Sequence, residues 1–166
     1  MYYQQAKASD YDLVLMLLQE AAHRLQLQGI DQWAYWLDPP PYKRSWLRSG
    51  VEAGQYHFLL SETDDIASMY RLSESDVDYW GEQQIAAYYV HSLVVRPAYS
   101  GRGYGRQMLE DVELSALAAG KVAVRLDCHA GNTRLCKYYL DLGYVKVGEK
   151  EMPHSLNNLY EKRLSV

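Results

Sequence analysis

The sequence feature that most constrains how this chain can fold is the junction between an apolar run and a glycine-rich segment. Residues 85–95, IAAYYVHSLVV, have the apolar and aromatic content of a strand that is buried on both faces. The segment SGRGYGRQML follows at 100–109 and leads into a helical pattern that ends at Gly120. The junction therefore predicts a strand, a glycine-rich loop and a helix in direct succession.

The charges around this loop predict an anionic ligand. No Asp or Glu lies between Gln83 and Gln107, whereas Arg96, Arg102 and Arg106 all fall there. A helix N-terminus already carries about half a positive charge, so each nearby cation costs on the order of 0.3–1 kcal/mol unless an anion binds. Glycines let backbone N–H groups approach that anion, and each charge-assisted hydrogen bond contributes about 1.5–3 kcal/mol. We interpret the loop as a phosphate cradle, with a solvated glycine-rich turn as the alternative.

The spacing of the loop disfavours two common phosphate motifs. The Walker motif requires Gly-Lys-Ser/Thr, and this segment contains no lysine. The Rossmann fingerprint has a different glycine spacing and follows the first strand, whereas this loop lies beyond the middle of the chain.

The composition narrows the remaining classes of protein. A length of 166 residues predicts one domain, residues 1–166, and 48% apolar residues suit a soluble globular core. No apolar run reaches the roughly 20 residues of a membrane span, and no signal peptide is visible, so we expect a cytoplasmic protein. A net charge of −4 argues against nucleic-acid binding. Cys128 and Cys136 have no metal-binding spacing, so we expect no metal site.

Hydrophobic patterns along the rest of the chain predict alternating helices and strands, in the order β, α, α, β, β, β, α, β, α, β, β. Expected strands cover residues 2–7, 56–61, 66–73, 85–95, 122–130, 144–152 and 157–164, and expected helices cover 9–28, 42–52, a segment from the loop to 120, and 132–143. The helix after the loop is expected to turn Met108, Leu109, Val112, Leu114, Leu117 and Ala118 inward.

Two segments together resemble the GNAT family of N-acetyltransferases, and the resemblance spans nearly the whole chain. One family signature is Gln or Arg, two residues, Gly, one residue, and Gly or Ala; LVVRPAYSGRGYGRQML supplies Gly103 and Gly105 in register, with Ser100 in place of Gln or Arg. The second signature is an Asn before a helix with an aromatic pair and a Gly-aromatic end. NTRLCKYYLDLGY matches it with Asn132, Tyr138, Tyr139, Gly143 and Tyr144.

The resemblance implies an α/β fold with a mixed central sheet, splayed strands and flanking helices. It also implies transfer of an acetyl group from acetyl-CoA to a primary amine by direct attack on the thioester, without a covalent nucleophile. The residues implied in cofactor binding are Leu93, Val94 and Val95 for the pantetheine arm, residues Gly101, Arg102, Gly103, Tyr104, Gly105 and Arg106 for the pyrophosphate, and Asn132 and Tyr138 on the second signature.

Two proton transfers accompany this reaction. Tyr139 matches the general acid of the family, and a phenol with an ordinary pKa near 10 is protonated at neutral pH. Either tyrosine of the pair can instead be a packing aromatic. For the base, His91 shares one strand face with Tyr89 and Leu93 and is the only one of the three that titrates near pH 7. The alternative for His91 is a hydrogen-bonded core histidine.

The acceptor site is expected near Trp33, Tyr35 and Trp36, which lie close in sequence to Asp31 and Asp38. Aromatic rings and carboxylates suit a cationic amine, either a small molecule or a peptide. The same rings can also cap the core or form the surface of a homodimer. The rival hypothesis for the whole chain is a non-catalytic acyl-CoA-binding or regulatory module of the same fold.

Overall fold

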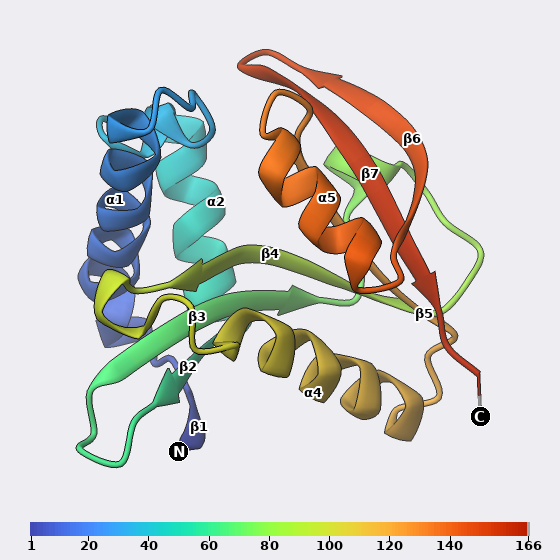
Figure 1. Ribbon diagram of the computed structural model, residues 1–166, viewed down its shortest axis with the longest axis horizontal. Coiled ribbons are helices and arrows are strands. Elements are labelled where there is room, and N and C mark those ends of the chain that lie inside the picture. Colours follow the sequence, from blue (N-terminus) through green and yellow to red (C-terminus); the bar gives the residue numbers. More distant parts are fainter. Residues whose placement is uncertain (166) are drawn as a thin grey trace. The chain divides into compact units, whose positions relative to one another are not determined.

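The computed structural model describes residues 1–165 and contains a mixed sheet of seven strands flanked by helices, which confirms the predicted fold class (Figure 1). In hydrogen-bonding order the strands are β1-β2-β3-β4-β5-β7-β6. The chain forms two compact units, described separately below: unit 1 contains Met1–Leu72 and Ser92–Gly105, and unit 2 contains Ser73–His91 and the chain from Arg106 onward.

Unit 1 contains the N-terminal strands and the first two helices. Its elements are β1 (Tyr2–Gln5), α1 (Tyr11–Leu27), α2 (Pro41–Glu52), β2 (Tyr56–Leu60), nearly all of β3 (Ile66–Ser73) and the last residues of β4 (Ala87–Val95). The strands β1, β2 and β3 pair antiparallel. Apolar side chains of β2, β3, the end of β4, α1 and α2 make one core, which includes Leu17, Leu47, Phe58 and Val94, whereas the residues of β1 are exposed.

The ends of the unit 1 helices follow from local sequence. A short 3-10 turn, Ala8–Asp10, precedes α1, and in it the Lys7 N–H donates a hydrogen bond to the Asp10 carboxylate at 2.7 Å. The helix ends before Gly29, which adopts a positive φ of 71°. Pro41 is the first residue of α2, where its missing N–H removes no helical hydrogen bond.

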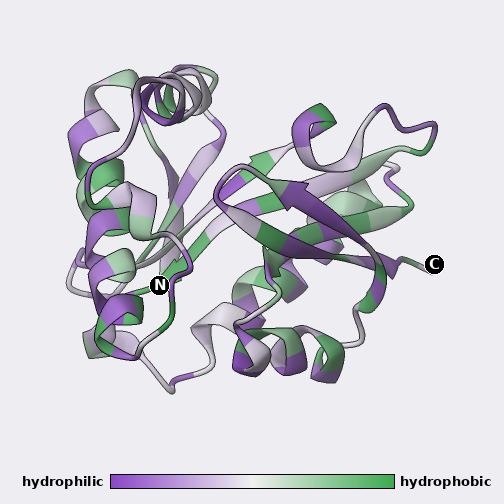
Figure 2. Ribbon diagram, turned by 90° about the horizontal axis from the view of Figure 1, so that it is seen from above, coloured by the Kyte–Doolittle hydropathy of each residue, from purple (hydrophilic) through white to green (hydrophobic). Residues whose placement is uncertain are grey.

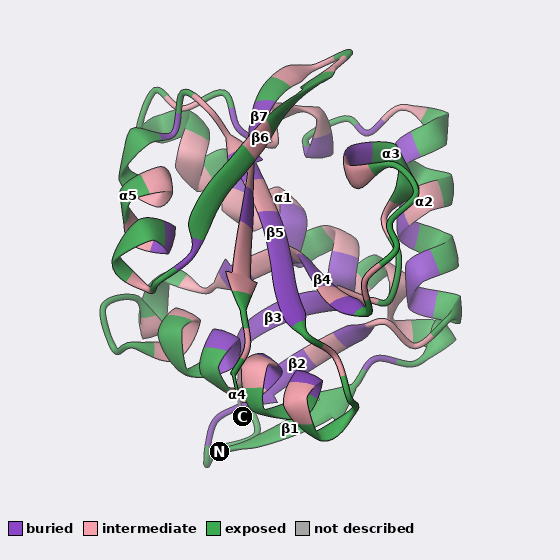
Figure 3. Cartoon of the chain, turned by 90° about the vertical axis from the view of Figure 1, so that its right-hand side faces the viewer, coloured by how far each residue is buried: buried purple, intermediate pink, exposed green. Residues whose placement is uncertain are grey.

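Unit 2 contains the first residues of β4 and the C-terminal half of the chain. Its elements are α3 (Val77–Trp80), most of α4 (Tyr104–Ala118), β5 (Ala123–His129), α5 (Thr133–Asp141), β6 (Val145–Met152) and β7 (Ser155–Arg163). The strand β5 pairs parallel with β4 and antiparallel with β7, so most of it is buried, whereas β6 is an exposed edge strand (Figure 3).

Two details of unit 2 differ from the sequence-based expectation. The single turn α3 was not predicted, because four residues are too few to show helical periodicity. The buried face of α4 consists of Met108, Leu109, Val112 and Ala116, whereas Leu114 is 65% exposed and Ala118 is also exposed. Positions 108, 112 and 116 repeat every fourth residue, and positions 114 and 118 face away from them.

The helices of both units carry hydrophobic and hydrophilic residues side by side, as the mixture of colours along their ribbons shows (Figure 2). Among the described residues, no helix combines the length and the apolar character that crossing a membrane requires. The long helices α1 and α4 each bury one apolar face.

Candidate functional site

The ladder between β4 and β5 stops just before two polar residues. Ala87 to Val90 pair with Ala123 to Leu126, and the next residues, His91 and Asp127, do not continue this ladder. The following residue, Ser92, has a positive φ of 53° although it is not glycine. The strand β4 is therefore irregular at the point where its first candidate catalytic residue lies.

In unit 1, the glycine loop, defined as residues 101–105, has the backbone geometry of an anion-binding turn. Gly101 and Gly103 have positive φ values of 76° and 82°. Within residues 1–165, the backbone amides of residues 101–103 donate no hydrogen bond, and the helix α4 that starts at Tyr104 adds the free amides of its first turn. A Cβ atom added to Gly101 or Gly103 would meet no protein atom within 4 Å. The loop thus presents unpaired N–H groups beside open space, which suits a phosphate.

The arginines near this loop have different surroundings. Arg96 is held by Glu20 of α1, with two N···O distances of 3.1 Å, so its charge is already paired. Arg102 is exposed, with its guanidinium carbon 5.5 Å from the centre of the Tyr99 ring. Arg24 of α1 donates a hydrogen bond to Ser100 Oγ at 3.0 Å. Sequence reasoning missed Arg24, because 76 residues separate it from Ser100.

The strand residues implied in binding the pantetheine arm lie in the last part of β4. Val94 is 4% exposed and belongs to the core of unit 1, whereas Leu93 and Val95 are half-buried. With the Val94 side chain in the core, this residue can contact a ligand only through its backbone.

In unit 2, Asn132 and the tyrosine pair occupy α5. Asn132 is the N-cap of this helix, and its Oδ1 accepts from the Leu135 N–H at 3.2 Å. Tyr139 is 5% exposed, and its ring lies 5.8–6.1 Å from the rings of Tyr138, Tyr144 and Tyr160. The Tyr139 hydroxyl makes no hydrogen bond within the described part of the chain.

Electrostatics differ between the two tyrosines. Burial, and then the nearby Cys128 and Asp127, raise the pKa of Tyr139 well above 10, so its hydroxyl stays protonated. Tyr138 is half-buried; burial raises its pKa, while the charge of Arg106 acts in the opposite direction. Cys128 lies beside Cys136 with both thiols reduced and their sulfur atoms 3.6 Å apart, and burial raises the pKa of the Cys128 thiol.

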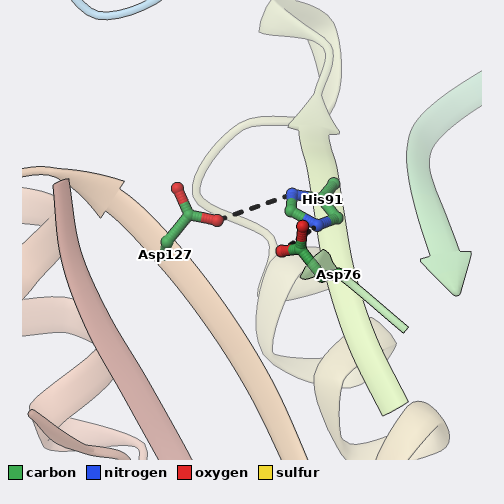
Figure 4. Close-up of side chains that lie close together, drawn as sticks. All are labelled: Asp76, His91 and Asp127. Carbon is green, nitrogen blue, oxygen red and sulfur yellow. Dashed lines mark ion pairs between the residues drawn. The ribbon is translucent and has the colours of Figure 1, made fainter. Parts of the chain in front are cut away.

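Also in unit 2, three side chains from three segments form the Asp-His-Asp cluster, defined as Asp76, His91 and Asp127 (Figure 4). The Nε2 atom of His91 lies 2.9 Å from Asp76 Oδ2, and its Nδ1 atom lies 3.5 Å from Asp127 Oδ1. The three side chains are 12%, 8% and 7% exposed for His91, Asp76 and Asp127. Sequence reasoning selected His91 but missed both carboxylates, because Asp76 is placed by the unpredicted α3 and Asp127 by β5.

The residues expected at the acceptor site lie in unit 1, and two of them, Tyr35 and Trp36, lie near the ammonium group of Lys43. Trp36 is 2% exposed and belongs to the core, whereas Trp33 and Tyr35 are half-buried. The Lys43 ammonium lies 4.4 Å from the centre of the Tyr35 ring and 5.9 Å from that of Trp36. The faces of these rings therefore already contact Lys43, and their role in acceptor binding stays a prediction.

Comparison with known proteins gives the same family over most of the chain. The model of the acetyltransferase (GNAT) family matches residues 16–144. A GNAT acetyltransferase from Listeria monocytogenes superposes with a TM-score of 0.78 at 24% identity, covering 98% of this chain and 94% of the other. One from Streptococcus agalactiae gives 0.78 at 16% identity, with coverages of 99% and 96%.

A NatC complex, solved bound to Gag peptide and CoA, matches with a TM-score of 0.68 at 12% identity over 99% of this chain and 98% of the other. At these identities the structures establish the shared fold, and the family model covers both signature segments of the sequence. The chain belongs to the acetyltransferase (GNAT) family.

Proposed function

We propose that this protein transfers an acetyl group from acetyl-CoA to a primary amine of a small molecule or a peptide. The observation that carries the proposal is the glycine loop, whose free backbone amides and two positive-φ glycines border open space at the start of α4. A pyrophosphate is the part of CoA that such a loop recognises, because several N–H groups can donate to it at once. Arg102 and Arg24 add positive charge beside the loop.

The chemistry of the family supports the choice of acetyl-CoA as the donor, and a structural relative was solved with CoA bound. When bound, acetyl-CoA supplies a thioester carbonyl that an amine can attack directly. This chain then has three tasks: it holds the phosphates with the loop amides, accepts the proton that the ammonium group loses, and donates a proton to the departing sulfur.

Tyr139 is the proposed proton donor. Its ring is fixed by three neighbouring tyrosine rings, while its hydroxyl is left without a hydrogen bond in the described residues, so the hydroxyl is oriented but available. Its raised pKa keeps the proton in place until the sulfur acquires charge. His91 is the proposed proton acceptor, because it is the only imidazole on β4 and lies at the end of the β4–β5 ladder.

A thiol-release assay tests this proposal directly. Acetyl-CoA and longer acyl-CoAs are supplied with a panel of polyamines, aminoglycosides, amino acids and peptides, and free CoA is measured alongside the mass of the acetylated product. We expect release of CoA only with an amine present, and a gain of one acetyl group on that amine. Calorimetric binding of CoA without turnover of any amine would instead favour the non-catalytic acyl-CoA-binding module. Absence of CoA binding would reject both functions.

A further inference from the structure

The Asp-His-Asp cluster contains a buried carboxylate oxygen that lacks an ordinary partner. The Oδ2 atom of Asp76 is buried and accepts no hydrogen bond of regular geometry among the described residues, and the His91 Nε2 atom lies 2.9 Å from it. Removing a carboxylate from water is costly unless a positive charge faces it. The position of His91 therefore favours an imidazole that carries, or readily takes up, a positive charge.

The two ring nitrogens face two different carboxylates, as Figure 4 shows. A neutral imidazole has one N–H donor and one lone pair. With its proton on Nε2, the ring donates toward Asp76, and the Nδ1 lone pair faces Asp127 at 3.5 Å. A second proton, on Nδ1, lets the ring turn an N–H group toward each of the two carboxylates. The doubly protonated imidazole is therefore the form of the ring that matches the two carboxylates on either side of it.

Both carboxylates are held in place by hydrogen bonds from groups other than His91. Asp76 is the N-cap of α3, and its Oδ1 accepts from the Tyr79 N–H. Asp127 Oδ2 accepts from Asn157 Nδ2 at 2.6 Å, and Asn157 Oδ1 accepts from Ser155 Oγ at 2.6 Å. These contacts hold the acids in position, so the imidazole lies between two preoriented negative charges.

We propose that Asp76, His91 and Asp127 act as one proton-accepting unit, in which the two carboxylates position the imidazole and stabilise its protonated form. This inference rests on the proposed function, because the proton is the one that the acceptor ammonium loses. The N–H bond of the ammonium breaks, its electron pair stays on the amine nitrogen, and the proton binds His91 Nδ1. His91 is the group that takes the proton, while Asp76 and Asp127 are positioning residues.

The geometry favours a proton over a metal ion at this cluster. A metal ion binds an imidazole through one nitrogen, and its other ligands gather around that same atom. Here Asp76 lies next to the Nε2 atom of the ring, and Asp127 lies next to the Nδ1 atom. One potential ligand atom from each of the three side chains nevertheless lies within 4.8 Å of the others, so bound zinc is a competing outcome that the experiment must register.

The charged and titratable groups around the His91 imidazole determine the pH at which it takes up a proton. The charged and titratable groups facing it are Asp76 and Tyr79 from the α3 segment and Asp127 from β5, with the Tyr79 ring centre 5.7 Å from that of His91. Arg125, two residues before Asp127, is paired with Glu161 and Tyr89 at 2.8 Å each. The charge of Asp127 also contributes to the raised pKa of Tyr139, so this carboxylate influences the proposed proton donor as well.

The test is a histidine-ring NMR titration of the free protein combined with a pH profile of kcat/KM. Loss of one signal in His91→Gln assigns the resonance. We expect His91 to titrate above the ordinary value of about 6.5, and Asp76→Asn or Asp127→Asn to lower its midpoint by about one pH unit each. Asn at position 76 keeps an oxygen that can accept the capping hydrogen bond, and Asn at position 127 keeps an oxygen that can accept from Asn157. Asp78→Asn removes an exposed charge two residues from Asp76 and should change nothing.

The kinetic profile must follow the NMR result. A base works in its neutral form, so lowering the midpoint of His91 moves the acid limb of kcat/KM to lower pH by the same amount and lowers the plateau. If His91 of the parent protein titrates near 6.5 and neither carboxylate variant changes this midpoint, the three residues do not act as one proton-accepting unit, even if the protein acetylates amines. One equivalent of tightly bound zinc that Asp127→Asn releases overturns it in favour of a metal centre. The expected NMR shifts without acetylation of any amine would support the unit and reject the proposed function.

Discussion

The glycine loop and the Asp-His-Asp cluster are two opposite ways to build a polar site. The loop is contiguous in sequence, and in the proposed function it binds phosphate through backbone N–H groups, so most of its side chains can vary as long as the glycines keep their positive φ values. The cluster joins three side chains from separate segments of the chain, and the proton-accepting role that we propose for it depends on each of them. A backbone site should therefore tolerate loss of side chains, whereas a side-chain site should not.

The two regions also differ in charge and exposure. The loop is exposed and is accompanied by arginines, so it suits a strongly hydrated anion that stays near the surface. The cluster is nearly buried and contains two carboxylates and one imidazole, so it suits a proton or an ammonium group. Substitutions in the loop and in buried side chains of unit 2 should therefore have effects of different size.

The largest effect is expected for a side chain of unit 2 that acts only during the reaction. Tyr139→Phe removes one oxygen and keeps the ring packing, so it should lower kcat by about 10²- to 10⁴-fold and leave the affinity for acetyl-CoA nearly unchanged. Steady-state kinetics and calorimetry measure the two quantities. Tyr138→Phe is the matched control and should keep a kcat close to that of the parent, because Tyr138 is implied in cofactor binding and not in proton transfer. A larger defect in Tyr138→Phe would show that the wrong tyrosine of the pair was assigned.

A backbone site should lose its ligand when a glycine gains a side chain. Gly103→Val places a branched side chain in the open space above the loop and disfavours the positive φ of 82°. We expect CoA affinity to fall by about 100-fold, which corresponds to the loss of one or two charge-assisted hydrogen bonds. Gly29→Val has the same backbone strain and open space at the end of α1, so it serves as the control. Unchanged CoA affinity in folded Gly103→Val protein would exclude the loop as the phosphate site.

The core of unit 2 should make the protein sensitive to alkali. The pKa of Cys128 is raised above its ordinary value of 9.0 chiefly by burial, so the unfolded chain releases this proton at a lower pH than the folded one. The protonated Cys128 thiol therefore contributes fully to the free energy of unfolding below pH 9. Above pH 9 this contribution decreases by about 1.4 kcal/mol per pH unit. Urea unfolding between pH 8 and pH 10 measures this slope. Cys128→Ala should reduce it and Cys136→Ala should retain it; equal slopes in all three proteins would contradict the assignment.

The smallest effect is expected for side chains of the loop. Arg102→Ala should weaken CoA binding about threefold at low salt and less at high salt, because exposed charges are screened over about 10 Å at 0.1 M. Arg24→Ala should behave similarly through the loss of its charge beside Ser100. Lys150→Ala on the exposed strand β6 removes the same charge elsewhere and controls for net charge. A loss that does not depend on salt would indicate packing and would weaken the view that the backbone carries most of the recognition.

Much of the chain could be predicted because its signals are local. Gly29 and Pro41 terminate and start helices through their own backbone geometry, and the apolar run at 85–95 contains β4. The phosphate-cradle interpretation of the loop also rests on neighbouring residues, since glycines beside a helix start are visible in sequence. The inward face of α4 was predicted less well, because periodicity alone did not exclude Leu114 from the buried side.

The sequence by itself determined the elements whose physics acts within a few residues: the helix ends, the strands, and a loop whose recognition uses consecutive backbone amides. The tertiary structure alone decided which side chains meet. Asp76 reaches His91 through the single turn α3, Asp127 reaches it from β5, and Arg24 reaches Ser100 from α1. The reason is that side-chain contacts between distant segments depend on packing and strand register, which leave no periodic mark in the residues that they bring together.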